Sequence, residues 1–299
     1  MRIAVCVKWV DTRPEVDALT GDVDHDLRRH GASAADRAAV ETALRLAECW
    51  TGSDGVQLDL VTVAPVEAEP MLAELGATGH WNLHRVSPRE TFAAEEPHHE
   101  GESSASVAAS LAAILGGHGG ADMTDPADIV VCGDHSLDRG SGAVPAFLAA
   151  RLGAAQALGL VAIEPIAPGE VIATRRLGAG RAERLSVRGP AVLSVEGSVA
   201  ALRRAPLAAV LKSPRVERHA SGSSSELGEA GDALRVLHRG PLRPRTRVVA
   251  PPHGADALTR ITELTGALVD RTPPRTVEAT PDEAADLVLA QLRSWGYVD

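Results

Sequence analysis

The sequence is poor in aromatic residues, with four Trp, two Phe and one Tyr among 299 residues. Proteins that bind single-stranded nucleic acids stack the bases on exposed aromatic rings, and this chain has few rings to offer. It also lacks a positive charge overall, because forty Asp and Glu outnumber thirty Lys and Arg. Phosphate backbones are bound through an excess of cations. We therefore expect no nucleic-acid partner.

Cysteines and long apolar runs are scarce as well. Cys6, Cys49 and Cys132 are widely spaced and form no Cys-x-x-Cys pair, which argues against a disulfide framework and a thiolate zinc site. No stretch approaches the ~18 consecutive apolar residues of a membrane helix. The apolar start MRIAVCVKWV is too short for a secretion signal. These features predict a cytoplasmic protein without membrane insertion.

Aliphatic and other hydrophobic residues make up 44% of the chain and follow a regular pattern. Up to about residue 196, short β-branched runs alternate with Ala- and Leu-rich amphipathic stretches, as in βαβ units. The pattern predicts helices over 34–48, after 70 and over 106–115. It predicts strands over 3–10, 56–63, 81–86 and 127–132, an antiparallel edge hairpin over 171–187, and a strand over 191–195 that closes the sheet. The expected fold class is α/β, with a doubly wound, mostly parallel sheet.

The C-terminal third lacks this alternation of strands and helices. We expect an α/β domain over 1–213, a linker and arm over 214–279, and a C-terminal amphipathic helix over 280–299. Thr280-Pro-Asp-Glu283 combines an N-cap, a proline in the first turn and a capping-box Glu. The helix carries an apolar stripe that must dock on this chain or on a partner, formed by Leu287, Val288, Leu292 and Trp295.

The segment from Cys132 to Val144 carries the strongest chemical signal, because a strand there runs through a small-residue turn into a helix. Backbone N–H groups of such a turn can surround a phosphate at a helix N-terminus. A second interpretation stays open, in which Gly140 and Gly142 only permit a tight turn and Ser141 is the N-cap. The segment lacks a Walker Gly-Lys-Ser/Thr and a full Gly-x-Gly-x-x-Gly. P-loop hydrolysis and dinucleotide binding therefore lose support.

This segment resembles the signature region of electron transfer flavoprotein β subunits, which share an adenine nucleotide α-hydrolase-like fold. The chain departs from the family pattern at Asp134, His135, Ala143, Pro145 and Ala146. The first strand, with Val7-Lys8-x-Val10, and the helix over 39–48 are also similar, so weak motifs extend over about 1–213. Residues that agree in the signature are Gly133, Asp138, Ser141, Gly142, Val144, Leu148, Ala149, Leu152 and Gly153.

The resemblance implies a non-catalytic electron carrier that binds AMP and shares FAD with an α subunit. Asp11 and Thr12 match the place where the family's β chain approaches the flavin. The AMP site carried over from the family comprises Cys6, Ser33, Asp36, Val63, Gly133, Asp138, Gly140, Ser141, Gly142, Ala143 and Val144.

The resemblance also implies partners. The family docks its electron donors, which are flavin or other dehydrogenases, through a loop after the last strand of the sheet. Here Arg203, Leu207 and Lys212 match its arginine, anchoring leucine and lysine. The implied partners are an α-like subunit, such a dehydrogenase, and a quinone reductase-type acceptor. Departures in the nucleotide turn and docking loop suggest a divergent branch, such as the one that accompanies the cofactor mycofactocin.

Other functions compete with this one. A universal-stress-type regulatory protein would bind an adenine nucleotide as a homodimer without flavin. A nucleotide pyrophosphatase would need a Ser-Gly-Gly-x-Asp-Ser loop after the first strand, which is missing. Metal binding at His98 and His99, beside Glu95, Glu96 and Glu100, competes with a solvated charged loop, and we predict no metal site. The arginines of 235–247 favour contact with an acidic protein surface.

Overall fold

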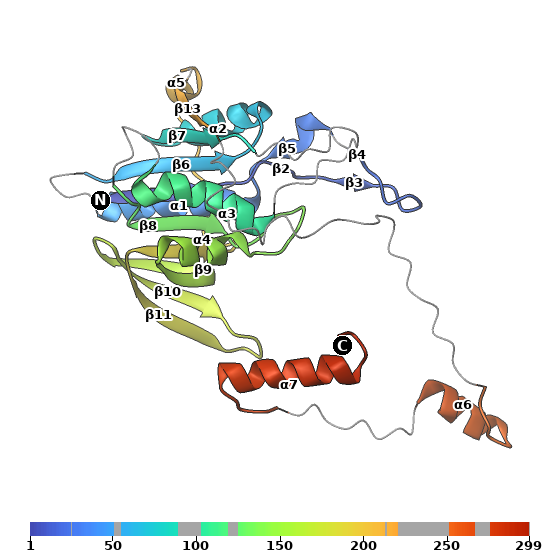
Figure 1. Ribbon diagram of the computed structural model, residues 1–299. Helices are drawn as coiled ribbons and strands as arrows, with labels where there is room; N and C mark the ends of the chain where they lie inside the picture. The colour runs from blue at the N-terminus through green and yellow to red at the C-terminus, as the bar shows by residue number, and fades with distance from the viewer. Residues whose placement is uncertain are drawn as a thin grey trace. The chain divides into compact units, whose positions relative to one another are not determined.

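The chain divides into two compact units, Met1–Leu242 and Arg243–Asp299, and each is described by itself (Figure 1). The computed structural model describes residues 1–24, 26–50, 55–88, 103–118, 125–212, 214–220, 251–266 and 276–298. The predicted loop cluster at 95–100 and the arginine-rich segment 235–247 lie outside these residues.

A nine-stranded sheet forms the centre of the first unit, in the order β11-β10-β9-β12-β8-β1-β6-β7-β13. The strands β9, β12, β8, β1, β6, β7 and β13, which are neighbours in this order, are parallel to one another. The two remaining strands, β10 and β11, are antiparallel to their neighbours. The strands are β1 (Arg2–Cys6), β6 (Gln57–Val63), β7 (Asn82–Val86), β8 (Ile129–Gly133), β9 (Ala155–Ala167), β10 (Glu170–Arg176), β11 (Ala182–Arg188), β12 (Ala191–Val195) and β13 (Val216–His219).

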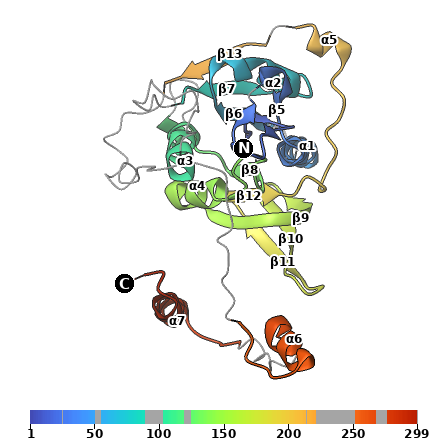
Figure 2. The ribbon, with the colours of Figure 1, turned by 90° about the vertical axis from the view of Figure 1, so that its right-hand side faces the viewer.

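Helices cover both faces of the sheet (Figure 2). On one face α1 (Ala34–Cys49) and α2 (Glu69–Gly76) bury alanines and leucines against Ile3. On the other, α3 (Ser104–Ala113) and α4 (Val144–Leu152) pack against the next residue, Ala4. Successive residues of a strand point to opposite faces, so both faces of this strand are buried, as a doubly wound sheet requires. The predicted fold class is confirmed.

Local signals set the first helix and the hairpin. Ser33 is the N-cap of α1, its hydroxyl accepts a hydrogen bond from the Asp36 amide, and the Asp36 carboxylate bonds back to Ser33. These two reciprocal hydrogen bonds form a capping box. The antiparallel edge formed by β10 and β11 was also predicted and is confirmed.

Several details of the strand prediction were wrong. The first strand ends at Cys6 rather than at residue 10, and β12 lies inside the sheet between β8 and β9 instead of closing it. No strand was predicted for β9 or β13. Because β13 pairs with β7, the sheet continues past residue 213. The order of parallel strands depends on crossover connections, which local patterns do not encode.

Short elements complete the first unit. Turns of 3-10 helix occur at Leu27–Arg29 and Val66–Ala68, an irregular turn at Ile114–His118, and α5 spans Leu207–Val210. Two small ribbons pair β2 (Val10–Asp11) with β5 (His30–Gly31) and β3 (Glu15–Val16) with β4 (Val23–Asp24).

The second unit contains α6 (Ala257–Thr265) and α7 (Pro281–Ser294). The predicted capping box of Thr280 and Glu283 begins α7. Within the described part of the second unit nothing covers the apolar stripe of α7, since Leu287 and Trp295 are 50% and 64% exposed. Among the described residues, no helix has the length and apolar character needed to cross a membrane.

Candidate functional site

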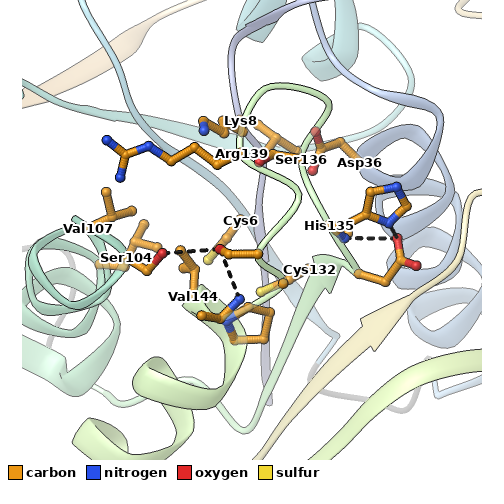
Figure 3. Close-up of a pocket in the computed structure, with 18 of the residues that line it drawn as sticks. Cys6, Lys8, Asp36, Ser104, Val107, Cys132, His135, Ser136, Arg139 and Val144 are labelled. Carbon is orange, nitrogen blue, oxygen red and sulfur yellow. Dashed lines mark hydrogen bonds and ion pairs between the residues drawn. The ribbon is translucent and has the colours of Figure 1, made fainter. Parts of the chain in front are cut away.

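A pocket lies where β1 and β8 end and α4 begins (Figure 3). Ser104 and Val107 of α3 form the wall opposite Asp36 and His135, and the sulfur atoms of Cys6 and Cys132 lie between these two walls. Ligands of open α/β sheets bind outside the carboxyl ends of the strands, and this pocket has that position.

The turn between β8 and α4 depends on glycine. Gly142 has φ +58°, and a Cβ there would lie 2.8 Å from the backbone oxygen of Asp134. A side chain would therefore face both an unfavourable backbone conformation and a clash. Gly133 allows α1 to lie close to the end of β8, because a Cβ at position 133 would be 2.9 Å from the Asp36 carboxylate of α1. The glycines keep the backbone of the turn on the surface of the pocket.

The N-terminus of α4 is open toward the pocket. Its N-cap is Ala143, which has no side-chain acceptor, so the interpretation of Ser141 as the N-cap was wrong. The Ser141 hydroxyl instead accepts a hydrogen bond of 3.4 Å from the Ala143 amide and lies 3.4 Å from the Ser104 hydroxyl. Amides of a first helical turn without a side-chain cap attract anions, and the helix dipole adds to the effect.

Two cationic residues that the predicted site omits line the same pocket, Lys8 and Arg139. Lys8 Nζ lies 2.5 Å from the Asp138 carboxylate, and both side chains are more than 40% exposed. An exposed pair of this kind contributes little to stability, so the lysine can turn toward an anionic ligand at small cost. The Val-Lys-x-Val motif of the first strand was the available signal for Lys8.

Asp36 is a buried carboxyl in the pocket wall. Burial raises its pKa to about 6, although hydrogen bonds from Ser33 and the Lys8 backbone act in the opposite direction. Its hydrogen-bond partners thus compensate only part of the desolvation cost. A carboxyl with a strongly raised pKa inside a cleft is typical of functional sites.

Cys6 and Cys132 occupy paired positions on β1 and β8 and form part of an apolar floor with Val63. The hydrogen bond with Cys6, followed by burial, raises the pKa of Cys132 well above its ordinary value. A thiol of this kind stays protonated and behaves as a small hydrophobic side chain. The floor fits a flat apolar group better than a nucleophile.

The pocket brings together most of the nucleotide site inferred from the sequence. Ser33 is not in its lining because the hydroxyl is used by the capping box of α1, and Asp138 and Gly140 belong to the adjoining turn. The predicted residues that do line it are Cys6, Asp36, Val63, Gly133, Ser141, Gly142, Ala143 and Val144.

Asp11 and Thr12 lie outside the pocket, in the first small ribbon. The Thr12 hydroxyl donates to the backbone oxygen of Arg29 at 2.8 Å, and the Asp11 carboxylate lies 3.5 Å from the Arg29 guanidinium. Both therefore hold the ribbon together, and their predicted approach to a flavin stays a prediction.

The three predicted docking residues have different environments. Arg203 binds Glu41 and Glu48 of α1, with a distance of 2.9 Å between its Nε and Glu41, so its guanidinium fixes the loop to the domain. Leu207 begins α5 and is 71% exposed. Lys212 follows the end of α5 and is also exposed.

Comparisons with known proteins extend this description. A search of the curated proteins found no match. The protein-family model of the electron transfer flavoprotein domain matches residues 25–221, about two thirds of the chain. Proteins of this family carry electrons, generally without catalysing a reaction, and generally pair with a partner subunit and dehydrogenases. The match includes α1, the glycine turn and the loop that carries Leu207, and the chain therefore belongs to the electron transfer flavoprotein family.

Proposed function

We propose that this chain is the β-like subunit of an electron transfer flavoprotein. It pairs with an α-like subunit and carries electrons from a dehydrogenase by way of an FAD shared between the chains, to a quinone reductase-type acceptor. The observation that carries the proposal is the open, glycine-lined turn at the end of β8, inside the matched family domain.

The residues of the pocket fit AMP. The amides at the start of α4 suit a phosphate, and Lys8 and Arg139 add positive charge to the lining of the pocket. The apolar floor of Cys6, Val63 and Cys132 suits the adenine ring. The turn can adopt this conformation only with glycine at position 142, because a Cβ there would clash with the backbone oxygen of Asp134.

The pocket residues bind and orient rather than react. Cys132 stays protonated because its pKa is raised, and Lys8 is positioned by Asp138. In this proposal AMP is a structural brace between β1, β8 and α4. FAD, when bound between the subunits, would supply the electron chemistry, and the protein would set its orientation and its electrostatic environment.

Exposed apolar side chains support the assignment of partners. Leu207, Val210 and Leu211 are 71%, 56% and 77% exposed on one short segment, which suits insertion into an apolar pocket of a dehydrogenase. The apolar stripe of α7 needs a covering surface, and an α-like subunit would provide one.

The test is to co-express the chain with an electron transfer flavoprotein α-like subunit, denature the purified complex, and identify the nucleotides released. We expect a yellow heterodimer that releases FAD and AMP. Gly142→Glu should abolish AMP retention, because the new side chain fills the turn and its charge repels the phosphate.

Gly169→Glu is the matched control. Gly169 also has positive φ, but a Cβ there meets no atom within 4 Å and the residue does not line the pocket. It should cause the strain of a positive φ without the clash, and it should leave AMP in place. Release of FAD without AMP from the wild-type complex would contradict the AMP assignment. A colourless homodimer that retains ATP would favour a universal-stress-type protein.

A further inference from the structure

A second polar cluster lies on the edge of the sheet, far from the glycine turn in the strand order. β13 lies beside β7 (Figure 1) and runs parallel to it, and Glu217 is paired in register with His84. His219, two residues further on, projects from the same face as Glu217. His84 is 2% exposed, whereas Glu217 and His219 are half-buried.

The ligand atoms of these three side chains converge. His84 Nδ1 lies 3.2 Å from His219 Nε2 and 3.3 Å from a Glu217 carboxylate oxygen, and the three atoms lie within 4.8 Å of one another. Ligands about 2.1 Å from a tetrahedral Zn²⁺ lie about 3.4 Å apart. Two of the three separations already match that geometry.

Asp59 fixes the orientation of His84 from behind. Its carboxylate lies 3.4 Å from His84 Nε2 and also accepts hydrogen bonds from Arg2 and Asn82. A carboxylate in this position holds the proton on Nε2 and leaves the Nδ1 lone pair facing the cluster. Metal-binding histidines are oriented in this way by a second carboxylate.

His84 Nδ1 faces both the Glu217 carboxylate and the His219 ring nitrogen. When His84 is neutral with its proton on Nε2, Nδ1 can accept a hydrogen bond from His219 but none from the Glu217 carboxylate. When His84 is protonated, it donates one hydrogen bond to Glu217 and one to Asp59. A metal ion can take the place of the Nδ1 proton, because this nitrogen and the carboxylate oxygen lie within reach of one cation.

We propose that His84, Glu217 and His219 bind a divalent transition-metal ion of the Zn²⁺ class. Two imidazoles and one carboxylate suit Zn²⁺, whereas Mg²⁺ and Ca²⁺ prefer oxygen ligands alone. Water would complete the coordination. The ion clamps β13 to β7 on one face, while on the other face Arg218 binds Glu69 and Glu69 binds Arg85.

The test is a titration of the metal-stripped full-length chain with Co²⁺, followed by visible absorption, with Zn²⁺ as the competitor. We expect one equivalent of Co²⁺ to give tetrahedral bands that Zn²⁺ removes. Glu217→Gln and His219→Ala should each weaken binding at least tenfold. Neither residue is fully buried, and Glu217→Gln preserves the size of the side chain, so circular dichroism should show folded variants.

Three control variants test whether other histidine or cysteine side chains of the chain bind the Co²⁺. His80→Ala removes an exposed histidine four residues before His84, and Cys49→Ser removes the exposed thiol. The double variant His98→Ala/His99→Ala removes the paired histidines of the sequence. All three should bind Co²⁺ as the wild type does. Wild-type affinity in both Glu217→Gln and His219→Ala, or loss of binding in the double variant, would overturn the proposal.

Discussion

Two buried carboxyls of the same domain, Asp36 and Asp59, have opposite electrostatic environments. Burial would raise the pKa of Asp59, but hydrogen bonds from His84, Arg2 and Asn82 outweigh it and lower the pKa to about 2. Burial dominates at Asp36, where hydrogen bonds from Ser33 and the Lys8 backbone leave the pKa at about 6. The two side chains differ in their partners rather than in their chemistry.

Asp59 belongs to a hydrogen-bond network that stabilises the fold, whereas Asp36 lies in the wall of the candidate site. At Asp59 a guanidinium, an amide and an imidazole satisfy the carboxylate, so the network holds β1, β6 and β7 together. At Asp36 a charge is kept beside a pocket without a cationic side chain bonded to it. Incomplete pairing costs stability and is retained in proteins mainly where a ligand or a reaction uses it.

The largest effect is expected from Asp59→Ala. The substitution leaves Arg2 buried without its carboxylate, and breaking a buried pair in this way costs ~3–5 kcal/mol of unfolding free energy. Chemical denaturation followed by circular dichroism measures the loss. Glu164→Ala, which breaks an exposed pair with Arg184, is the control and should cost at most ~1 kcal/mol. Equal losses of unfolding free energy in the two variants would mean that Asp59 stabilises the protein no more than an exposed ion pair does.

Asp36→Asn should have the opposite sign. The folded-state pKa of Asp36, about 6, exceeds the ordinary 3.8, so the contribution of this carboxyl to the stability of the wild type falls as the pH rises from about 4 to about 6. Each pKa unit corresponds to ~1.4 kcal/mol, which gives about 3 kcal/mol in total. Asparagine carries no charge to desolvate. The variant should be ~1–3 kcal/mol more stable at pH 7.

Denaturation of both proteins at several pH values between 4 and 7 checks this expectation. Asp59 does not interfere, because its lowered pKa affects stability only as the pH falls from about 4 to about 2. An unchanged slope between pH 4 and pH 6 in Asp36→Asn would mean that Asp36 is as well compensated as Asp59.

Leu207→Ala should have the smallest effect on stability, because the side chain is 71% exposed. The unfolding free energy should change by less than ~0.5 kcal/mol. Reduction of the heterodimer by its dehydrogenase should slow without loss of FAD if Leu207 anchors the partner. Leu19→Ala, at a residue 82% exposed outside the docking loop, is the matched control. Equal reduction rates in both variants would remove Leu207 from the docking surface.

Much of the pocket could be predicted because its residues belong to local patterns. The Ser33–Asp36 capping box and the glycines of the turn after β8 each follow from a short segment, whereas the pairing of Cys6 with Cys132 joins two strands far apart in the sequence. Lys8 was missed as a pocket residue because the pocket forms only where the end of β1 meets the turn after β8, and Lys8 is 130 residues from Asp138 of that turn. Arg203 matches a docking residue of the family, yet its side chain binds α1.

The sequence alone determined the α/β class, the starts of α1 and α7 and the resemblance to the electron transfer flavoproteins, since propensities, caps and glycine turns act within a few residues. Only the tertiary structure decided that β12 lies inside the sheet, that β13 extends its edge, and that Asp36 and Asp59 differ in pKa. It also brought His219 to His84 across 135 residues. Strand order, burial and convergence of side chains arise from long-range packing, which no local segment specifies.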